Sequence, residues 1–85
     1  MLKMHKKGDS MKFNKNLIPE FMNDDLFFKL SELGFLDYKR IRDYAIRREF
    51  KELRKTKGAN ESIMIIHNNY PELQIDTIRK IIYIK

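Results

Sequence analysis

Apolar residues in the first half of the chain recur at helical spacing and predict a short helix ending before Gly34. The residues at this spacing are Leu26, Phe27, Leu30 and Leu33, and the three leucines share one face. Asn23 or Asp24 can cap the first turn through a side-chain oxygen. Gly34 can adopt the left-handed conformation that commonly ends a helix. We expect folded structure to begin near Leu17.

A longer amphipathic helix is predicted from Tyr38 to about Lys57. At 100° per residue its two sides differ sharply in character. The apolar side holds Tyr38, Ile41, Ala45, Ile46, Phe50 and Leu53, and the opposite side holds Arg40, Arg47, Lys51, Arg54 and Lys55. Asp37 can cap the first turn, and Gly58 is expected to end the helix.

The basic side of this helix is a candidate for contact with a polyanion. From residue 38 to 57 there are nine Lys or Arg against three acids, and such a stripe can follow a phosphate backbone. A merely solvated face is the alternative. Arg42 and Glu49 fall within the apolar side, where an unpaired charge is costly. We expect each to find an opposite charge or a backbone carbonyl, unless this side is only partly covered or mediates self-association.

Two further helices are predicted near the C-terminus. Asn60 can cap a short helix over 61–69, which is apolar nearly all round and should be central in the core. Pro71 disfavours a helical conformation at the residue before it. The final helix then opens at Gln74 or Asp76 and runs to about Tyr83. Its inward residues are Ile78, Ile81 and Ile82, and its outward residues are Asp76, Arg79, Lys80 and Tyr83. A strand over 81–84 is the alternative, but the spacing is helical and does not alternate.

Composition narrows the class of protein. Eighty-five residues allow one domain, and the absence of cysteine excludes disulfide scaffolds and favours a reducing compartment. The net charge of +6 favours polyanionic partners. No apolar run is long enough for a signal peptide, which needs about 7 residues, or for a membrane span, which needs about 18. We therefore expect a cytoplasmic all-α protein that does not bind membranes. It should have a flexible basic arm over 1–16 and one domain over 17–85, a small bundle of about four helices.

Two short helices joined by a tight turn, with a polar outward side on the second, describe a helix-turn-helix. The segments 41–53 and 70–83 resemble small bacterial and phage helix-turn-helix proteins of the Trp-repressor-like and homeodomain-like groups. The second helix of those proteins often reads Leu-Ser-x-x-Thr-Ile-x-x-Ile. Residues 73–81, LQIDTIRKI, match every specified position except the serine, where Gln74 stands.

The resemblance, which covers about residues 24–83, implies that the second helix enters the major groove of double-stranded DNA. The DNA-facing residues would then be Gln74, Ile75, Asp76, Thr77, Arg79 and Lys80. Arg79 can pair with guanine and Gln74 with adenine through two hydrogen bonds each. Helix capping is the alternative role for Gln74 and Asp76, packing for Thr77, and a solvated face for Arg79 and Lys80. Tyr83 could stack on a partner or be a surface aromatic, as could Tyr44; the other Phe and Tyr side chains are expected in the core.

Catalytic and metal-binding patterns are absent from the sequence. The two histidines, His5 and His67, do not have metal-ligand spacing, and no serine has a base with an orienting partner. We therefore expect a non-catalytic protein without cofactors, a DNA-binding transcriptional regulator of bacterial or phage origin. A phage accessory or virion protein that uses the helix-turn-helix for protein interaction is the alternative. A homodimer or protein partner is compatible with either, in the host cytoplasm or in the virion.

Overall fold

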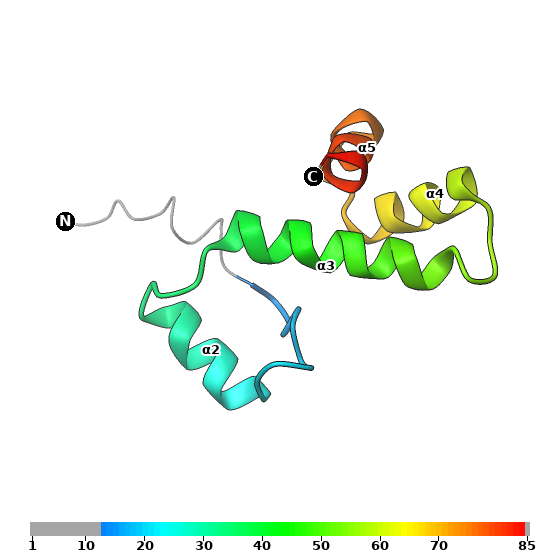
Figure 1. Ribbon diagram of the computed structural model, residues 1–85. Coiled ribbons are helices and arrows are strands. Elements are labelled where there is room, and N and C mark those ends of the chain that lie inside the picture. The colour runs from blue at the N-terminus through cyan, green and yellow to red at the C-terminus, as the bar shows by residue number, and fades with distance from the viewer. Residues whose placement is uncertain (1–12, 85) are drawn as a thin grey trace. The chain divides into compact units, whose positions relative to one another are not determined.

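The computed structural model describes residues 13–84, which contain four α-helices and no strand (Figure 1). The helices are α2 (Asp24–Glu32), α3 (Tyr38–Leu53), α4 (Ala59–Asn69) and α5 (Ile75–Tyr83). The predicted all-α fold with four helices is confirmed. None of the described helices is long and apolar enough to cross a membrane.

The chain divides into two compact units, residues 1–42 and 43–85, and the boundary falls within α3. We call them the N-terminal and the C-terminal unit and describe each by itself. The part of the predicted basic arm over residues 1–12 lies outside the described residues. Residues 13–16 belong to the N-terminal unit, where Phe13 is half-buried.

The ends of α2 are fixed by one side chain and one glycine, as predicted. The Asn23 side-chain oxygen accepts a hydrogen bond from the Leu26 amide at 2.8 Å, which satisfies a free donor of the first turn. Gly34 follows the helix with φ at 80°, and the Phe35 amide donates to the Leu30 carbonyl at 3.0 Å. This bond and the left-handed glycine form the Schellman ending of a helix.

The core of the N-terminal unit is built around Phe27, which is fully buried. Its ring lies 4.8 Å from the ring of Phe13 in an edge arrangement, and the Phe13 ring lies 5.0 Å from that of Tyr38. Edge and tilted contacts of this kind are favourable arrangements for aromatic rings. Leu17 and Ile18 complete the buried set, so the folded part includes the predicted start near Leu17.

Several aromatic residues expected in the core lie at the surface of the N-terminal unit. Phe35 is 72% exposed and Phe21 is 65% exposed. The expectation was wrong for this part of the chain, because Phe27 is the one phenylalanine between residues 21 and 35 that is buried in the core. Leu26 and Leu33, on the leucine face of the same helix, are also exposed.

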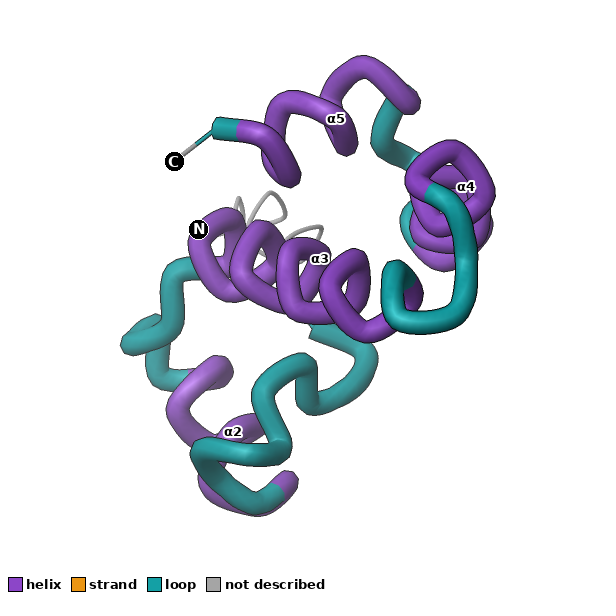
Figure 2. The backbone as a smooth tube through the Cα atoms, turned by 45° about the vertical axis from the view of Figure 1, so that its right-hand side comes forward, coloured by secondary structure: helices purple, strands orange, loops and turns teal. Residues whose placement is uncertain are grey.

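The core of the C-terminal unit takes isoleucines from all three of its helices. Ile46 comes from α3, Ile63 and Ile66 come from α4, and Ile78 comes from α5; all four are buried and form one cluster. Partly buried residues surround this cluster, namely Phe50, Leu53, Tyr70, Leu73, Ile75, Ile81 and Ile82. The chain turns back after α3 into α4 (Figure 1), and α5 crosses α4 at a steep angle (Figures 1 and 2).

The boundary between α3 and α4 differs from the prediction. The helix α3 ends at Leu53 and continues as hydrogen-bonded turns in which the Lys57 amide donates to the Leu53 carbonyl at 2.9 Å. Gly58 does not end α3 in a left-handed conformation. Its φ of −73° and ψ of 167° place it in the extended region as the N-cap of α4, so α4 begins two residues before the predicted position and Asn60 lies inside the helix.

Helix α4, expected to be central in the core, supplies Ile63 and Ile66 to the core cluster but is not buried on every side. Ser62, Ile63 and Ile66 are buried, whereas Met64 is half-exposed. The buried Ser62 hydroxyl donates to the Gly58 carbonyl at 2.8 Å, so its polar atom is satisfied within the helix's own first turn.

Candidate nucleic-acid interface

The connection between α4 and α5 consists of residues 70–74 and sets the start of α5. Pro71 lacks an amide hydrogen and cannot continue α4, and the Leu73 amide donates to the Tyr70 carbonyl at 3.0 Å to close a turn. Gln74 is the N-cap of α5 in an extended conformation, and its carbonyl accepts from the Ile78 amide at 3.0 Å. The Gln74 side chain makes no capping hydrogen bond and is exposed. It is therefore available to a partner.

The two sides of α5 differ sharply in burial. Ile78 is fully buried against α3 and α4, and its neighbours Ile75, Ile81 and Ile82 are half-buried. The exposed side holds Gln74, Asp76, Arg79, Lys80 and Tyr83, and we call these five residues the α5 surface. The remaining predicted DNA-facing residues, Ile75 and Thr77, are half-buried and lie at its margin.

The charged groups of the α5 surface are not neutralised by each other. Asp76 lies three and four residues before Arg79 and Lys80, a spacing at which helical ion pairs can form. None of the three forms an ion pair with any of the described residues. Two cations and one carboxylate are therefore presented separately to solvent.

A ring contact holds the C-terminal end of α5 against α3. The Tyr83 ring lies 6.0 Å from the Phe50 ring at an interplanar angle of 77°, although Tyr83 is 59% exposed. Arg47 lies about 60° around α3 from Phe50; it is exposed and has no ion pair among the described residues. Arg47 therefore lies nearer than Lys51 to the side of α3 that carries Phe50.

The other predicted cations of α3 are engaged locally or lie elsewhere. Arg40 belongs to the N-terminal unit, where its Nε lies 3.6 Å from an Asp37 carboxylate oxygen. Arg54 donates to the Lys57 carbonyl at 3.0 Å, and Lys55 pairs with a Glu52 carboxylate oxygen at 3.2 Å. Both ion pairs are solvent-exposed, so they add little stability.

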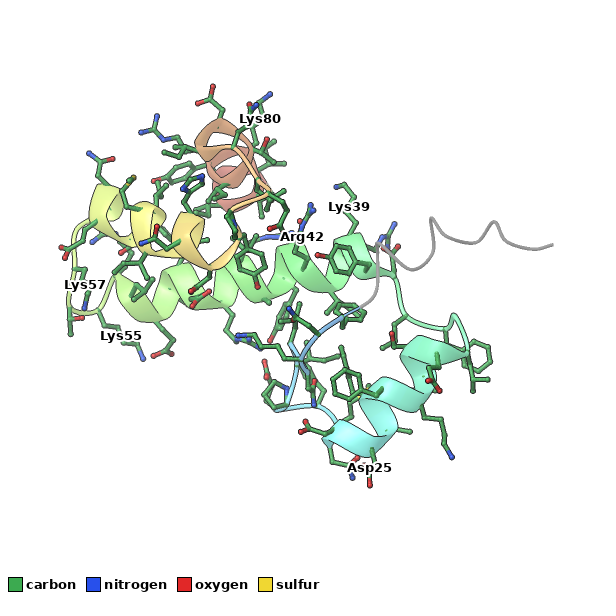
Figure 3. All side chains as sticks on the ribbon, turned by 180° about the vertical axis from the view of Figure 1, so that it is seen from behind. Asp25, Lys39, Arg42, Lys55, Lys57 and Lys80 are labelled. Atoms are coloured by element: carbon green, nitrogen blue, oxygen red, sulfur yellow. The ribbon has the colours of Figure 1, made fainter. Side chains whose placement is uncertain are left out.

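The basic stripe of α3 is therefore not one continuous surface with α5. In Figure 3, Lys80 lies on the outer side of α5, whereas Lys55 points away from the opposite side of the C-terminal unit. Lys51, which is exposed and has no ion pair among the described residues, lies about 100° around α3 from Phe50. Among the predicted α3 cations, Arg47 lies nearer than Lys51 to the Phe50 side of α3, and Lys55 points away from α5.

Arg42 and Glu49, the two charges within the apolar side of α3, are half-buried. The Arg42 guanidinium carbon lies 5.9 Å from the centre of the Tyr38 ring, within the range of a cation–π contact. A Glu49 carboxylate oxygen accepts a hydrogen bond from the Asn69 side-chain amide at 3.1 Å. Their half-burial shows that this side of α3 is partly covered.

Two relevant residues were not singled out by sequence reasoning. Phe50 was assigned only to the core, and its contact with Tyr83 joins residues 33 positions apart, which periodicity cannot reveal. Lys57 was not among the residues predicted for the basic side of α3. Its position next to Gly58, at the predicted end of that helix, could have been read from the sequence. The described residues include no group of three or more His, Cys, Asp or Glu side chains that could hold a metal ion.

Comparison of the chain with models of known protein families, with curated proteins and with solved structures finds no match.

Proposed function

We propose that the C-terminal unit binds double-stranded DNA by placing the α5 surface in the major groove. On this proposal the protein is a non-catalytic regulator of transcription from a bacterium or a phage. The observation that carries the proposal is the division of α5 into two sides. Ile78 anchors the helix in the core, while Arg79 and Lys80 are exposed and free of ion pairs with other described residues.

The chemistry of the α5 surface suits both parts of DNA recognition. Arg79 can donate two hydrogen bonds to the edge of guanine, and Gln74, which is not used as a cap, can pair with adenine in the same way. Lys80 and Arg47 supply charge for phosphate contacts, which position the protein without reading sequence. The Phe50–Tyr83 contact keeps the end of α5 in place while these groups engage the groove.

A salt titration of duplex binding tests this proposal. With about five phosphate contacts, the logarithm of the binding constant should fall with the logarithm of salt concentration at a slope of about −4 to −5. The variant R79Q/K80Q should have a slope shallower by about one and an affinity lower by at least about fivefold at physiological salt, since the phosphate contact of Lys80 is worth about fivefold there and the base contact of Arg79 is lost with it. The measurement is fluorescence anisotropy on a labelled random-sequence duplex.

The matched control is K15Q/K29Q, which removes the same charge from two exposed cations of the N-terminal unit. It should bind duplex DNA nearly as well as the unchanged protein. Absence of duplex binding even at low salt, or an equal loss in the control, contradicts the proposal.

Protein interaction is the second candidate function, and the exposed apolar residues of the N-terminal unit favour it. Leu26, Leu33 and Phe35 are 45%, 61% and 72% exposed, and grouped exposed apolar residues are typical of interaction surfaces. On this alternative the chain is an accessory or virion protein of a phage. It would copurify with a protein partner and would not bind duplex DNA at low salt.

A further inference from the structure

A second group of cations lies at the end of α3, outside the α5 surface. Residues 51–57 contain four of them, Lys51, Arg54, Lys55 and Lys57, and one acid, Glu52. The first three are exposed and Lys57 is half-buried. We call these four residues the turn surface.

The turn surface is held in shape by hydrogen bonds. The Arg54 amide donates to the Phe50 carbonyl at 2.9 Å, and the Lys57 amide donates to the Leu53 carbonyl at 2.9 Å. The Arg54 side chain donates a hydrogen bond to the Lys57 carbonyl at 3.0 Å. Because the backbone is fixed in this way, the cations stand in a defined arrangement and lose little backbone freedom on binding.

Lys55 and Lys57 of the turn surface point in a different direction from the α5 surface. Figure 3 shows Lys80 on the outer side of α5, with Lys55 and Lys57 at the far end of α3 and directed away from α5. A straight duplex lying along the α5 surface therefore leaves Lys55 and Lys57 facing away from it.

We propose that the turn surface binds the phosphate backbone of a second duplex, so that one C-terminal unit bridges two DNA segments. This proposal rests on the function proposed above, because the first duplex is held by the α5 surface. The ligand of the turn surface is the sugar–phosphate backbone, since three of its four cations are lysines and the fourth, Arg54, already donates to the Lys57 carbonyl. The second contact should therefore be independent of sequence and sensitive to salt.

A two-duplex capture experiment tests the bridge. One duplex is immobilised on beads, a second fluorescent duplex is added in solution, and the protein is supplied at a concentration below saturation. The unchanged protein should retain the fluorescent duplex. The variant K55Q/K57Q should retain at least about tenfold less, because two phosphate contacts at about fivefold each are lost. Anisotropy on a single duplex should show that this variant still binds through α5.

The matched variant R79Q/K80Q removes the same charge from the other surface. It should lose both the bridge and most of the binding to a single duplex, so the two variants separate the two surfaces. Circular dichroism of both variants checks that their helix content is unchanged.

Each remaining outcome has a definite meaning. Binding of single duplexes without capture of the second overturns the bridge and leaves the proposed function intact. Capture that persists in K55Q/K57Q also overturns it and points instead to bridging by a dimer through two α5 surfaces. Failure of the unchanged protein to bind any duplex overturns the proposed function, and the bridge with it.

Discussion

Gly34 and Gly58 both follow a helical segment, but they do so in different backbone conformations. Gly34 has φ at 80°, a conformation that costs other residues about 1–2 kcal/mol. Gly58 has φ at −73° and ψ at 167°, which any residue adopts readily. A Cβ atom would meet nothing within 4 Å at either position, so backbone conformation alone separates them.

The same substitution should therefore have opposite effects at the two glycines. We expect G34S to lower the free energy of unfolding by about 1 kcal/mol, because serine is strained in the left-handed region. We expect G58S to raise it by about 0.5 kcal/mol, because serine can cap α4 and restricts the unfolded chain. Thermal unfolding followed by circular dichroism measures both, at about 4–8 °C per kcal/mol. Equal shifts of the same sign would contradict this account.

At the scale of elements, the helices follow from local sequence more closely than their ends do. The final helix was predicted to open at Gln74 or Asp76 and to end at about Tyr83, and α5 runs from Ile75 to Tyr83 with Gln74 as its N-cap. The end of α3 was not, because residues 54–57 have no helix-breaking residue and continue in hydrogen-bonded turns. Whether Gly58 ends α3 or begins α4 depends on how α4 packs. This packing cannot be predicted from the local sequence.

The position of α5 depends on contacts that are distant in sequence. Ile78 joins α5 to the isoleucine cluster, and its burial could be predicted because it lies on the apolar side of the helix. The Phe50–Tyr83 ring contact could not be predicted, since Tyr83 lies on the exposed side. The apolar pattern therefore predicts which side of α5 faces inward, and tertiary packing decides how its far end is held.

A substitution at Tyr83 tests whether this ring holds the end of α5. We expect Y83L to lower the free energy of unfolding by about 0.5–1 kcal/mol, because the ring pair is lost. Y83F keeps the ring and removes only the hydroxyl, which has no hydrogen-bond partner among the described residues, so it should leave stability unchanged. Urea unfolding at a fixed temperature compares the two variants. A Y83F variant as unstable as Y83L would assign the effect to the hydroxyl instead.

At the scale of the whole molecule, net charge does not distinguish the two units. Each contains nine Lys or Arg and six Asp or Glu. What distinguishes them is where the charges lie, and composition could not predict this. The sequence predicted that Arg79 and Lys80 face outward together. It also predicted one basic stripe along α3, and Lys55 of that stripe points away from the α5 surface.

Substitutions at two acids, Asp76 and Glu61, distinguish how total charge affects DNA binding from how the position of the charge affects it. Asp76 lies in the first turn of α5 on the α5 surface, and Glu61 lies in the first turn of α4; both are exposed. Neutralising either one raises the net charge from +6 to +7. Each substitution also removes a favourable interaction with a helix N-terminus, which costs about 0.3–1 kcal/mol of stability.

If the α5 surface meets phosphates, only the carboxylate within it should matter for binding. We expect D76N to raise the affinity for a random-sequence duplex about threefold to fivefold, because a repulsion of about 1 kcal/mol at short range in water is removed. E61Q should change that affinity by less than about twofold, because its charge is distant and screened by salt. Anisotropy titrations at one salt concentration compare the two variants. Equal gains in affinity for both variants would mean that total charge governs binding. That result would contradict the proposal that DNA binds at the α5 surface.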